Sequence, residues 1–276
     1  MTPTIRTLSL AEITMFVDWA AGEGWNPGRH DAAAFHAADP GGFFGAFVDD
    51  EMVAGIAAVA YGKDFGFIGL YICRPDMRGK GYGKAVWDAG MARLSGRTVG
   101  LDGVPAQQAN YRSMGFVTDY ATFRWSGRFA GAAQPEPTQS ISPDRFAAVD
   151  AFDRLHFPAP RAAFLERWIA PPHVALVCMD GDRVRGYGVA RACREGFKVG
   201  PLFAGDIDVA VTLLASLAGA CGGDIHIDVP GGQGEFCAML GAAGLSRGFE
   251  TARMYRGPAP AIQTDGVYGV TSLELG

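Results

Sequence analysis

Three glycines alternate with basic and aromatic side chains in a short stretch of the chain, residues 78–84, which reads RGKGYGK. Glycine lets the backbone turn tightly and leaves its N–H groups uncovered by side chains. A helix that follows such a turn adds its own unpaired N–H groups and its positive dipole end. Because the whole chain carries a net charge of −5, this locally basic turn predicts a phosphate-binding site.

The elements around this turn are a strand and a helix. Residues 65–73 form an apolar run that is long enough for a buried strand, and the residues from 82 to 94 have the composition of a helix. The spacing of the glycines does not match two other known phosphate-binding loops. The dinucleotide fingerprint needs G-x-G-x-x-G, whose third glycine here comes one residue early, and the nucleoside-triphosphate loop needs Ser or Thr where Ala85 stands.

The arrangement R-G-x-G-x-G between a strand and a helix resembles the pyrophosphate loop of the GNAT (GCN5-related N-acetyltransferase) superfamily. A chance cluster is the alternative in a chain with 39 glycines. The resemblance implies that acetyl-CoA is the co-substrate and that the backbone of Tyr71 and Cys73 pairs with its pantetheine arm and polarises the thioester carbonyl. The other implied CoA-binding residues are Arg78, Gly79, Lys80, Gly81, Tyr82, Gly83, Lys84 and Asn110.

Acetyl transfer to an amine also needs an uncharged amine and a proton for the departing thiolate. Residues 110–116, NYRSMGF, resemble the GNAT signature whose tyrosine is the general acid, which assigns that role to Tyr111; a core tyrosine is the alternative. Asp102 and Glu23 are candidate bases, although both could be solvated or capping residues. Direct attack by the amine in a ternary complex is favoured over an acyl-enzyme on Cys73, because an apolar strand raises the pKa of a thiol.

Composition excludes several classes of protein. With 276 residues, 49% hydrophobic and 19% charged, the chain is expected to be a globular protein of one large or two ordinary domains. Nucleic acid and membrane are not expected as partners, because clustered basic residues are confined to the phosphate turn. Five cysteines without a C-x-x-C pair and five histidines without ligand spacing indicate no disulfide framework and no metal. Since no signal segment is evident, we expect a cytoplasmic protein.

The chain reads as a duplicated α/β (α+β) fold. Strands are expected at residues 4–8, 43–48, 52–60, 65–73, 98–104 and 118–125, and helices at 11–21, 31–38, 82–94 and 106–114. This order is that of a GNAT domain, a mixed and mostly antiparallel sheet flanked by helices. We therefore predict a GNAT acetyltransferase domain at residues 1–130, a proline-rich linker at 131–143 and a GNAT-like domain at 144–276.

The second half repeats the first but lacks its chemistry. LDGVP at residues 101–105 is echoed by IDVP at 227–230, and each half ends in a basic and aromatic strand. No glycine-rich basic loop follows residues 196–202, and Leu240 stands where the first half has Tyr111. The second domain is therefore predicted to be degenerate, and nearly the whole chain resembles bacterial tandem GNAT proteins of that kind. A fragment ending near Gly131 is expected to keep acetyl-CoA binding.

The acceptor is expected to be the amine of a small molecule, bound near Trp25, Asn26 and Gly28, with Lys198 and its strand lining the pocket from the second half. Two alternatives stay open: a CoA-responsive regulatory protein without turnover, and an acetyltransferase for protein lysines. The sequence leaves the acceptor, the acyl-chain length, the general base and the oligomeric state open, a homodimer included.

Overall fold

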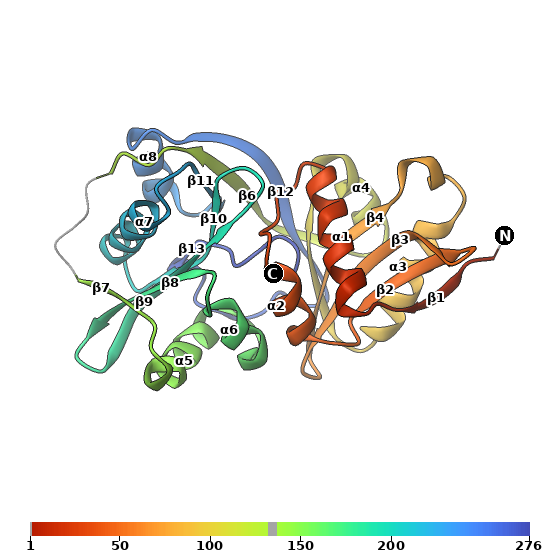
Figure 1. Cartoon of the computed structure of the whole chain (residues 1–276), viewed down its shortest axis with the longest axis horizontal. Helices are drawn as coiled ribbons and strands as arrows, with labels where there is room; N and C mark the ends of the chain where they lie inside the picture. The colour runs from red at the N-terminus through yellow and green to blue at the C-terminus, as the bar shows by residue number, and fades with distance from the viewer. Residues whose placement is uncertain (1, 132–136) are drawn as a thin grey trace.

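The computed structural model describes residues 2–131 and 137–276, which form two lobes around one continuous, mostly antiparallel sheet (Figure 1). The strands follow one another in the order β1-β2-β3-β4-β5-β12-β6-β11-β10-β9-β8-β7, and β13 pairs with β10. The C-terminal residue lies in the middle of the molecule, between the lobes, whereas the N-terminal end lies at one extremity.

The first half contains the helices and strands predicted for it, with bounds that differ by one or two residues. Ser9 caps the first helix in a capping box with Glu12. The elements are β1 (Thr4–Thr7), α1 (Leu10–Gly22), α2 (Asp31–Ala38), β2 (Phe43–Val48), β3 (Glu51–Tyr61), β4 (Phe65–Cys73), η1 (Pro75–Met77), α3 (Tyr82–Arg93), β5 (Thr98–Gly103), α4 (Pro105–Ser113) and β6 (Val117–Gly127).

The second half repeats this order. Its elements are β7 (Thr138–Ser140), η2 (Pro143–Arg145), α5 (Phe146–His156), α6 (Ala162–Trp168), β8 (Val174–Asp180), β9 (Arg183–Ala192), β10 (Phe197–Ala204), α7 (Ile207–Cys221), β11 (Ile225–Pro230), α8 (Gly234–Ala242), β12 (Ser246–Arg256), η3 (Thr264–Gly266) and β13 (Val267–Gly269). Of the predicted linker, residues 132–136 lie outside the described residues. Its later part contributes β7, which pairs with β8.

The two halves exchange their last long strands. β12 of the second half lies between β5 and β6, and β6 of the first half lies between β12 and β11. A fragment ending near Gly131 would therefore lose the strand that pairs with β5. The expectation that such a fragment keeps acetyl-CoA binding stays a prediction, and this topology argues against it because the side of β5 that pairs with β12 would become an open edge. The division at residues 131–143 stays a prediction about the sequence repeat.

Two buried ion pairs hold the exchanged strands in register. Arg253 of β12 lies opposite Asp102 of β5 and donates to both carboxylate oxygens at 2.9 Å. Arg124 of β6 lies opposite Asp228 of β11 and donates to its two oxygens at 2.7 and 2.9 Å. Each arginine thus reaches from its own half to the acid of the other half. These acids are the aspartates of the repeated LDGVP and IDVP motifs.

The hydrophobic core is also shared. Phe35 of α2 stacks on Trp168 of α6 with 5.9 Å between ring centroids, and Tyr61 of β3 meets Phe157 at 4.9 Å. One cluster of buried side chains contains residues of both halves. Separating the halves would therefore expose apolar surface on each of them.

The tail that follows β13, residues 270–276, is buried between the halves. Arg161 donates to the hydroxyl of Thr271 at 2.9 Å, and the hydroxyl of Tyr61 donates to the carbonyl of Leu275 at 3.1 Å. At Gly69 of β4, an added Cβ would lie only 1.8 Å from the carbonyl oxygen of Glu274. A glycine is therefore required at position 69 for the tail to cross β4 this closely.

We expect Arg253→Met to lower the free energy of unfolding by about 3–5 kcal/mol, because it leaves the buried Asp102 without its partner. The double variant Asp102→Leu/Arg253→Met should recover much of this loss, since it removes both charges. Urea unfolding of the wild type, both single variants and the double variant gives the coupling energy. A cost below about 1 kcal/mol for Arg253→Met would show that the pair does not hold β12 on β5.

We expect Gly69→Ala to lower the free energy of unfolding by at least about 1–3 kcal/mol, the usual cost of overpacking, because the methyl group would collide with the backbone of Glu274. Gly219→Ala is the matched control, since an added Cβ on this residue of α7 meets nothing within 4 Å. The control should be neutral or slightly stabilising by helix propensity. Equal urea midpoints for the two variants would contradict the close crossing.

Candidate active site

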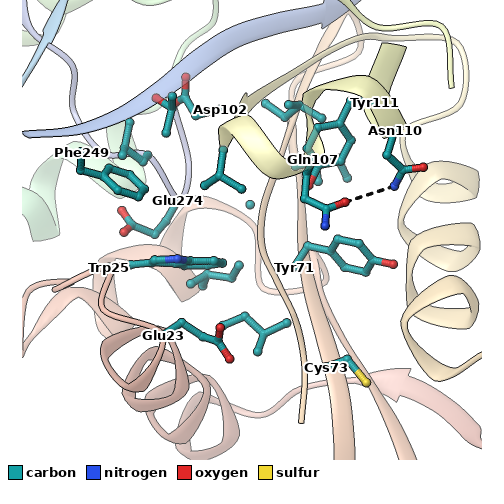
Figure 2. A pocket seen from close by; sticks show the side chains of 18 of the residues that line it. Glu23, Trp25, Tyr71, Cys73, Asp102, Gln107, Asn110, Tyr111, Phe249 and Glu274 are labelled. Carbon is teal, nitrogen blue, oxygen red and sulfur yellow. Dashed lines mark hydrogen bonds between the residues drawn. The ribbon is translucent and has the colours of Figure 1, made fainter. Parts of the chain in front are cut away.

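A cavity of about 470 Å³ opens where β4 and β5 diverge, and both halves line it (Figure 2). The two strands are parallel and pair only from Phe65 and Thr98 to Ile68 and Leu101. Beyond this point β4 bends away, with Leu70 at a φ of +45° and a shift of register between β3 and β4. Such a bulge re-aims the backbone and leaves ladder groups unpaired.

The bulge sets the positions of Tyr71 and Cys73. Leu70 and Tyr71 have no Cα partners in the ladder with β3, whereas Cys73 lies opposite Ala54. Both Tyr71 and Cys73 line the cavity. Burial raises the pKa of the Cys73 thiol, which therefore stays protonated near neutral pH. This argues against an acyl-enzyme on Cys73 and leaves the backbone of the bulge to contact a ligand.

The glycine-rich turn has the geometry of an anion site. Gly79 and Gly81 adopt φ values of +77° and +86°, which side chains rarely tolerate. Gly81 is the N-cap of α3 and provides no side-chain cap, so the first N–H groups of that helix are left for a ligand. Tyr82 and Gly83 begin the helix, and an added Cβ on Gly83 would lie 3.0 Å from the hydroxyl of Tyr71.

The basic residues of the turn are placed unequally. Arg78 lines the cavity, donates to the carbonyl of Cys73 at 3.1 Å and pairs with Glu23 at 2.7 Å. Lys80 and Lys84 are exposed, and Lys84 pairs with Asp88 at 2.5 Å. Of the sequence-predicted CoA residues, those that line the cavity are Tyr71, Cys73, Arg78 and Asn110.

Tyr111 lies in the wall of the cavity that α4 forms. Its ring stacks on Trp87 of α3 with 5.7 Å between centroids, and its side chain points into the cavity beside Asn110 and Gln107 (Figure 2). Burial raises its pKa to about 12. The phenol is therefore neutral at pH 7 and keeps its proton to donate. No hydrogen bond ties its hydroxyl to the part of the chain that the structure describes.

The two predicted bases both lie at the cavity, but each already has a cationic partner. Asp102 is held by Arg253 through two hydrogen bonds; burial raises the pKa of its carboxyl, and the guanidinium opposes that rise. Glu23 pairs with Arg78 at the cavity mouth. A carboxylate whose lone pairs are occupied by an arginine is a weak proton acceptor.

The predicted acceptor residues separate into two groups. Trp25 lines the cavity, whereas Asn26, Gly28 and Lys198 do not. The side chain of Asn26 exchanges hydrogen bonds with the backbone of Glu195, and the N–H of Gly28 donates to Asp31. Lys198 was expected in the lining. It is instead buried behind Trp25, where it donates to that carbonyl at 3.1 Å, as Arg124 also does.

Four lining residues come from the second half and were not predicted from the sequence: Phe249, Thr251, Leu273 and Glu274. Phe249 and Thr251 lie on β12, in the part of the strand that runs beside β6 before the ladder with β5 begins at Ala252. Leu273 and Glu274 belong to the buried tail. No local sequence signal marks these residues, because their position depends on pairing between segments about 150 residues apart.

The corresponding cleft of the second half is filled by the protein itself. β10 and β11 also pair only at one end, from Phe197 to Val199 on β10, but β13 then pairs with β10, and the N–H of Val270 donates to the carbonyl of Asp228 on β11. Asp206 caps α7 and accepts from the N–H of Val209 at 3.0 Å. A carboxylate thus occupies the helix terminus at which a phosphate would bind.

Leu240 occupies the same position in the second half as Tyr111 does in the first. The N–H of Leu245 donates to the carbonyl of Leu240 at 3.0 Å, as that of Phe116 does to Tyr111 at 3.1 Å, and Gly244 and Gly115 have matching positive φ values. Leu240 is therefore the structural equivalent of Tyr111, and it is fully buried.

No group of three or more His, Cys, Asp or Glu side chains in the described ranges could hold a metal ion. Among the same residues, no helix is both long and apolar enough to cross a membrane.

Comparison with known proteins gives matches in both halves. The model of the acetyltransferase (GNAT) family matches residues 9–117, and that of an acetyltransferase (GNAT) domain matches residues 149–269. A relative from Pseudoalteromonas sp. (strain SANK 73390), named holothin acyltransferase, is 34% identical over 277 residues, covering 99% of this chain and 94% of the relative. An uncharacterized N-acetyltransferase of Bacillus subtilis, YitH, is 23% identical and covers 86% of each chain.

Two solved structures show the same fold. A candidate acetyltransferase from Pyrococcus horikoshii superimposes with a TM-score of 0.83 at 21% identity, covering 100% of this chain and 96% of the other. A tandem GNAT protein from the clavulanic acid biosynthesis pathway gives a TM-score of 0.63 at 13% identity, covering 93% and 99%. The chain is thus an N-acyltransferase and belongs to the GNAT family, as a tandem protein with one GNAT domain in each half.

Proposed function

We propose that this protein transfers the acetyl group of acetyl-CoA to the amine of a small molecule, by direct attack in a ternary complex in the first half. The observation that carries the proposal is the cavity between β4 and β5, which is lined by Arg78 of the glycine-rich turn, by the bulge of β4 and by Tyr111. The second half closes the other side of this cavity through Phe249, Thr251, Leu273 and Glu274.

The acetyl-CoA site rests on three features of the first half. The uncapped start of α3 and the amides of residues 79–83 suit the pyrophosphate, and the bulge at Leu70 leaves backbone groups for the pantetheine arm and the thioester carbonyl. Asn110 lines the same cavity. Because β13 and Asp206 fill the equivalent positions of the second half, we propose one CoA site per chain.

Tyr111 supports the leaving group in this scheme. The amine nitrogen attacks the thioester carbonyl carbon, the C–N bond forms and the C–S bond breaks, which leaves charge on the sulfur. A phenol with a pKa of about 12 is a weaker acid than a thiol, so Tyr111 stabilises the developing thiolate chiefly as a hydrogen-bond donor. A regulatory protein without turnover would not need a donor at this place.

A small acceptor is favoured over a protein lysine, because the cavity is lined from both halves and is only about 470 Å³ in volume. The relative named holothin acyltransferase, which aligns along almost the whole chain, also supports a small-molecule acceptor. The absence of nucleic-acid and membrane partners, the cytoplasmic location and a homodimer stay predictions.

We expect acetyl-CoA to bind the wild type at one site per chain and to bind Gly81→Asp at least tenfold more weakly. The added carboxylate would repel the pyrophosphate, and the left-handed backbone at position 81 disfavours a side chain. Gly62→Asp is the matched control, because Gly62 also has a positive φ and open space but lies away from the turn. Isothermal titration calorimetry that found two equivalent sites, or equal affinity in both variants, would contradict the site.

We expect Tyr111→Phe to bind acetyl-CoA as the wild type does but to transfer acetyl about a hundredfold more slowly, the lower end of the usual effect of a positioned acid. Tyr120→Phe is the control, since Tyr120 lies on β6 and does not line the cavity. Release of CoA thiol is followed with a panel of small primary amines. A parental rate for Tyr111→Phe would make Tyr111 a packing residue.

A further inference from the structure

Glu274 is a buried acid without a partner in the cavity. Its side chain belongs to the tail and is 3% exposed, and its Oε2 has no hydrogen-bond partner in the described parts of the chain. The other two acids that line the cavity, Asp102 and Glu23, are paired with Arg253 and Arg78. Because an unpaired buried carboxylate costs several kcal/mol in desolvation, Glu274 is expected to have a ligand as its partner.

The surroundings of Glu274 indicate what that ligand is. Figure 2 shows its carboxyl group between the rings of Trp25 and Phe249, on the opposite side of the cavity from Tyr111. The hydroxyl of Thr251, which lines the same cavity, also has no hydrogen-bond partner among the residues that the structure describes. Aromatic faces attract an ammonium group and an apolar body, and the carboxylate and hydroxyl can each accept a hydrogen bond from it.

The charges near this end do not suit an acidic acceptor. Arg78 is the cation among the cavity-lining residues that the structure describes, and it already binds Glu23. The charged groups that interact with Glu274 are Asp102, which also lines the cavity, and Arg124 and Lys198, which do not. Both cations are engaged, since Arg124 binds Asp228 and both donate to the carbonyl of Trp25. A ligand carboxylate would therefore meet Glu274 without a free cation.

We propose that Glu274 binds the protonated amine of the acceptor and accepts its proton, and that the acceptor is a cationic amine with an apolar or aromatic body and no carboxylate. This inference rests on the proposed function and deepens it. The crossing at Gly69 brings the backbone of Glu274 against β4 beside the bulge, where the thioester carbonyl is expected. The side chain of Glu274 lines the same cavity as Tyr111, so its carboxylate can take the proton of the amine directly or through one water.

The protons balance as follows. The ammonium has three protons and the amide product keeps one. Glu274 takes the first of the two protons that are lost, which frees the nitrogen lone pair for attack, and later releases that proton to water. The second proton leaves the nitrogen as the amide forms, and it balances the proton that the CoA thiolate takes up with the help of Tyr111. One C–N bond forms and one C–S bond breaks.

Binding to the full-length protein saturated with CoA tests the proposal without turnover. We expect 2-phenylethylamine to bind the wild type and to bind Glu274→Gln at least tenfold more weakly, while Glu274→Asp retains part of the affinity because it keeps the charge. Phenylalanine, which adds a carboxylate to the same body, should bind the wild type at least tenfold more weakly than 2-phenylethylamine. Calorimetry measures all of these affinities, and CoA itself should bind the three proteins equally.

The rate of acetyl transfer to two different amines distinguishes a chemical role of Glu274 from a purely structural one. With acetyl-CoA, Glu274→Gln should lower kcat/KM for 2-phenylethylamine about a hundredfold, the scale of a positioned base. For aniline, which is uncharged at pH 7 and needs no ammonium site, the loss should be at least tenfold smaller. Equal losses for the two amines would reduce Glu274 to a packing residue.

Three further results would overturn the proposal: equal binding of 2-phenylethylamine to the wild type and Glu274→Gln, phenylalanine binding as tightly as 2-phenylethylamine, or no binding of 2-phenylethylamine, tryptamine or benzylamine to the CoA-loaded wild type. Failure of CoA and acetyl-CoA to bind the wild type would instead refute the proposed function. The two failures are therefore distinguishable.

Discussion

The architecture depends on two reciprocal ion pairs, Asp102 with Arg253 and Asp228 with Arg124, which join the exchanged strands β12 and β6 to the halves that receive them. A buried carboxylate or guanidinium is costly alone, so each strand is stabilised only in the register that brings its arginine opposite the aspartate. This register in turn places Phe249 and Thr251 of β12 in the cavity of the first half. The geometry of the site is therefore a consequence of pairing between the halves.

The second half has a part of its own chain at each position that corresponds to the proposed CoA site of the first half. Asp206 caps α7, β13 pairs with β10, and Leu240 stands where the first half has Tyr111. Lys198 of the second half and Arg124 of β6 both donate to the carbonyl of Trp25, which holds one wall of the cavity in place.

The sequence allowed the local elements and the glycine-rich turn before α3 to be predicted, because their signals are short-range. The alternating glycines at 79–83, the capping box at Ser9 and the tyrosine at 111 each lie within a few residues of the features that identify them. The strand exchange could not be predicted, because the sequence allows β5 to pair with the last strand of either half. Only the structure shows that Arg253 of β12 lies opposite Asp102 of β5. Glu274 could not be predicted for the same reason, because its contact with Gly69 joins positions about 200 residues apart. Lys198 was wrongly predicted to line the cavity, whereas it lies behind the cavity wall.

The tail connects the two clefts physically. Residues 267–269 close the cleft of the second half as β13, and residues 273–274 enter the cleft of the first half only a few positions later. Any shift of the tail that opened one cleft would move the groups that shape the other, because Gly69 leaves no space for the backbone of Glu274 to slide over β4. The filled cleft of the second half therefore anchors the tail that carries Glu274 into the cavity of the first half. Under the proposal made above, the choice of acceptor would thus depend on the second half, although acetyl transfer would take place in the first.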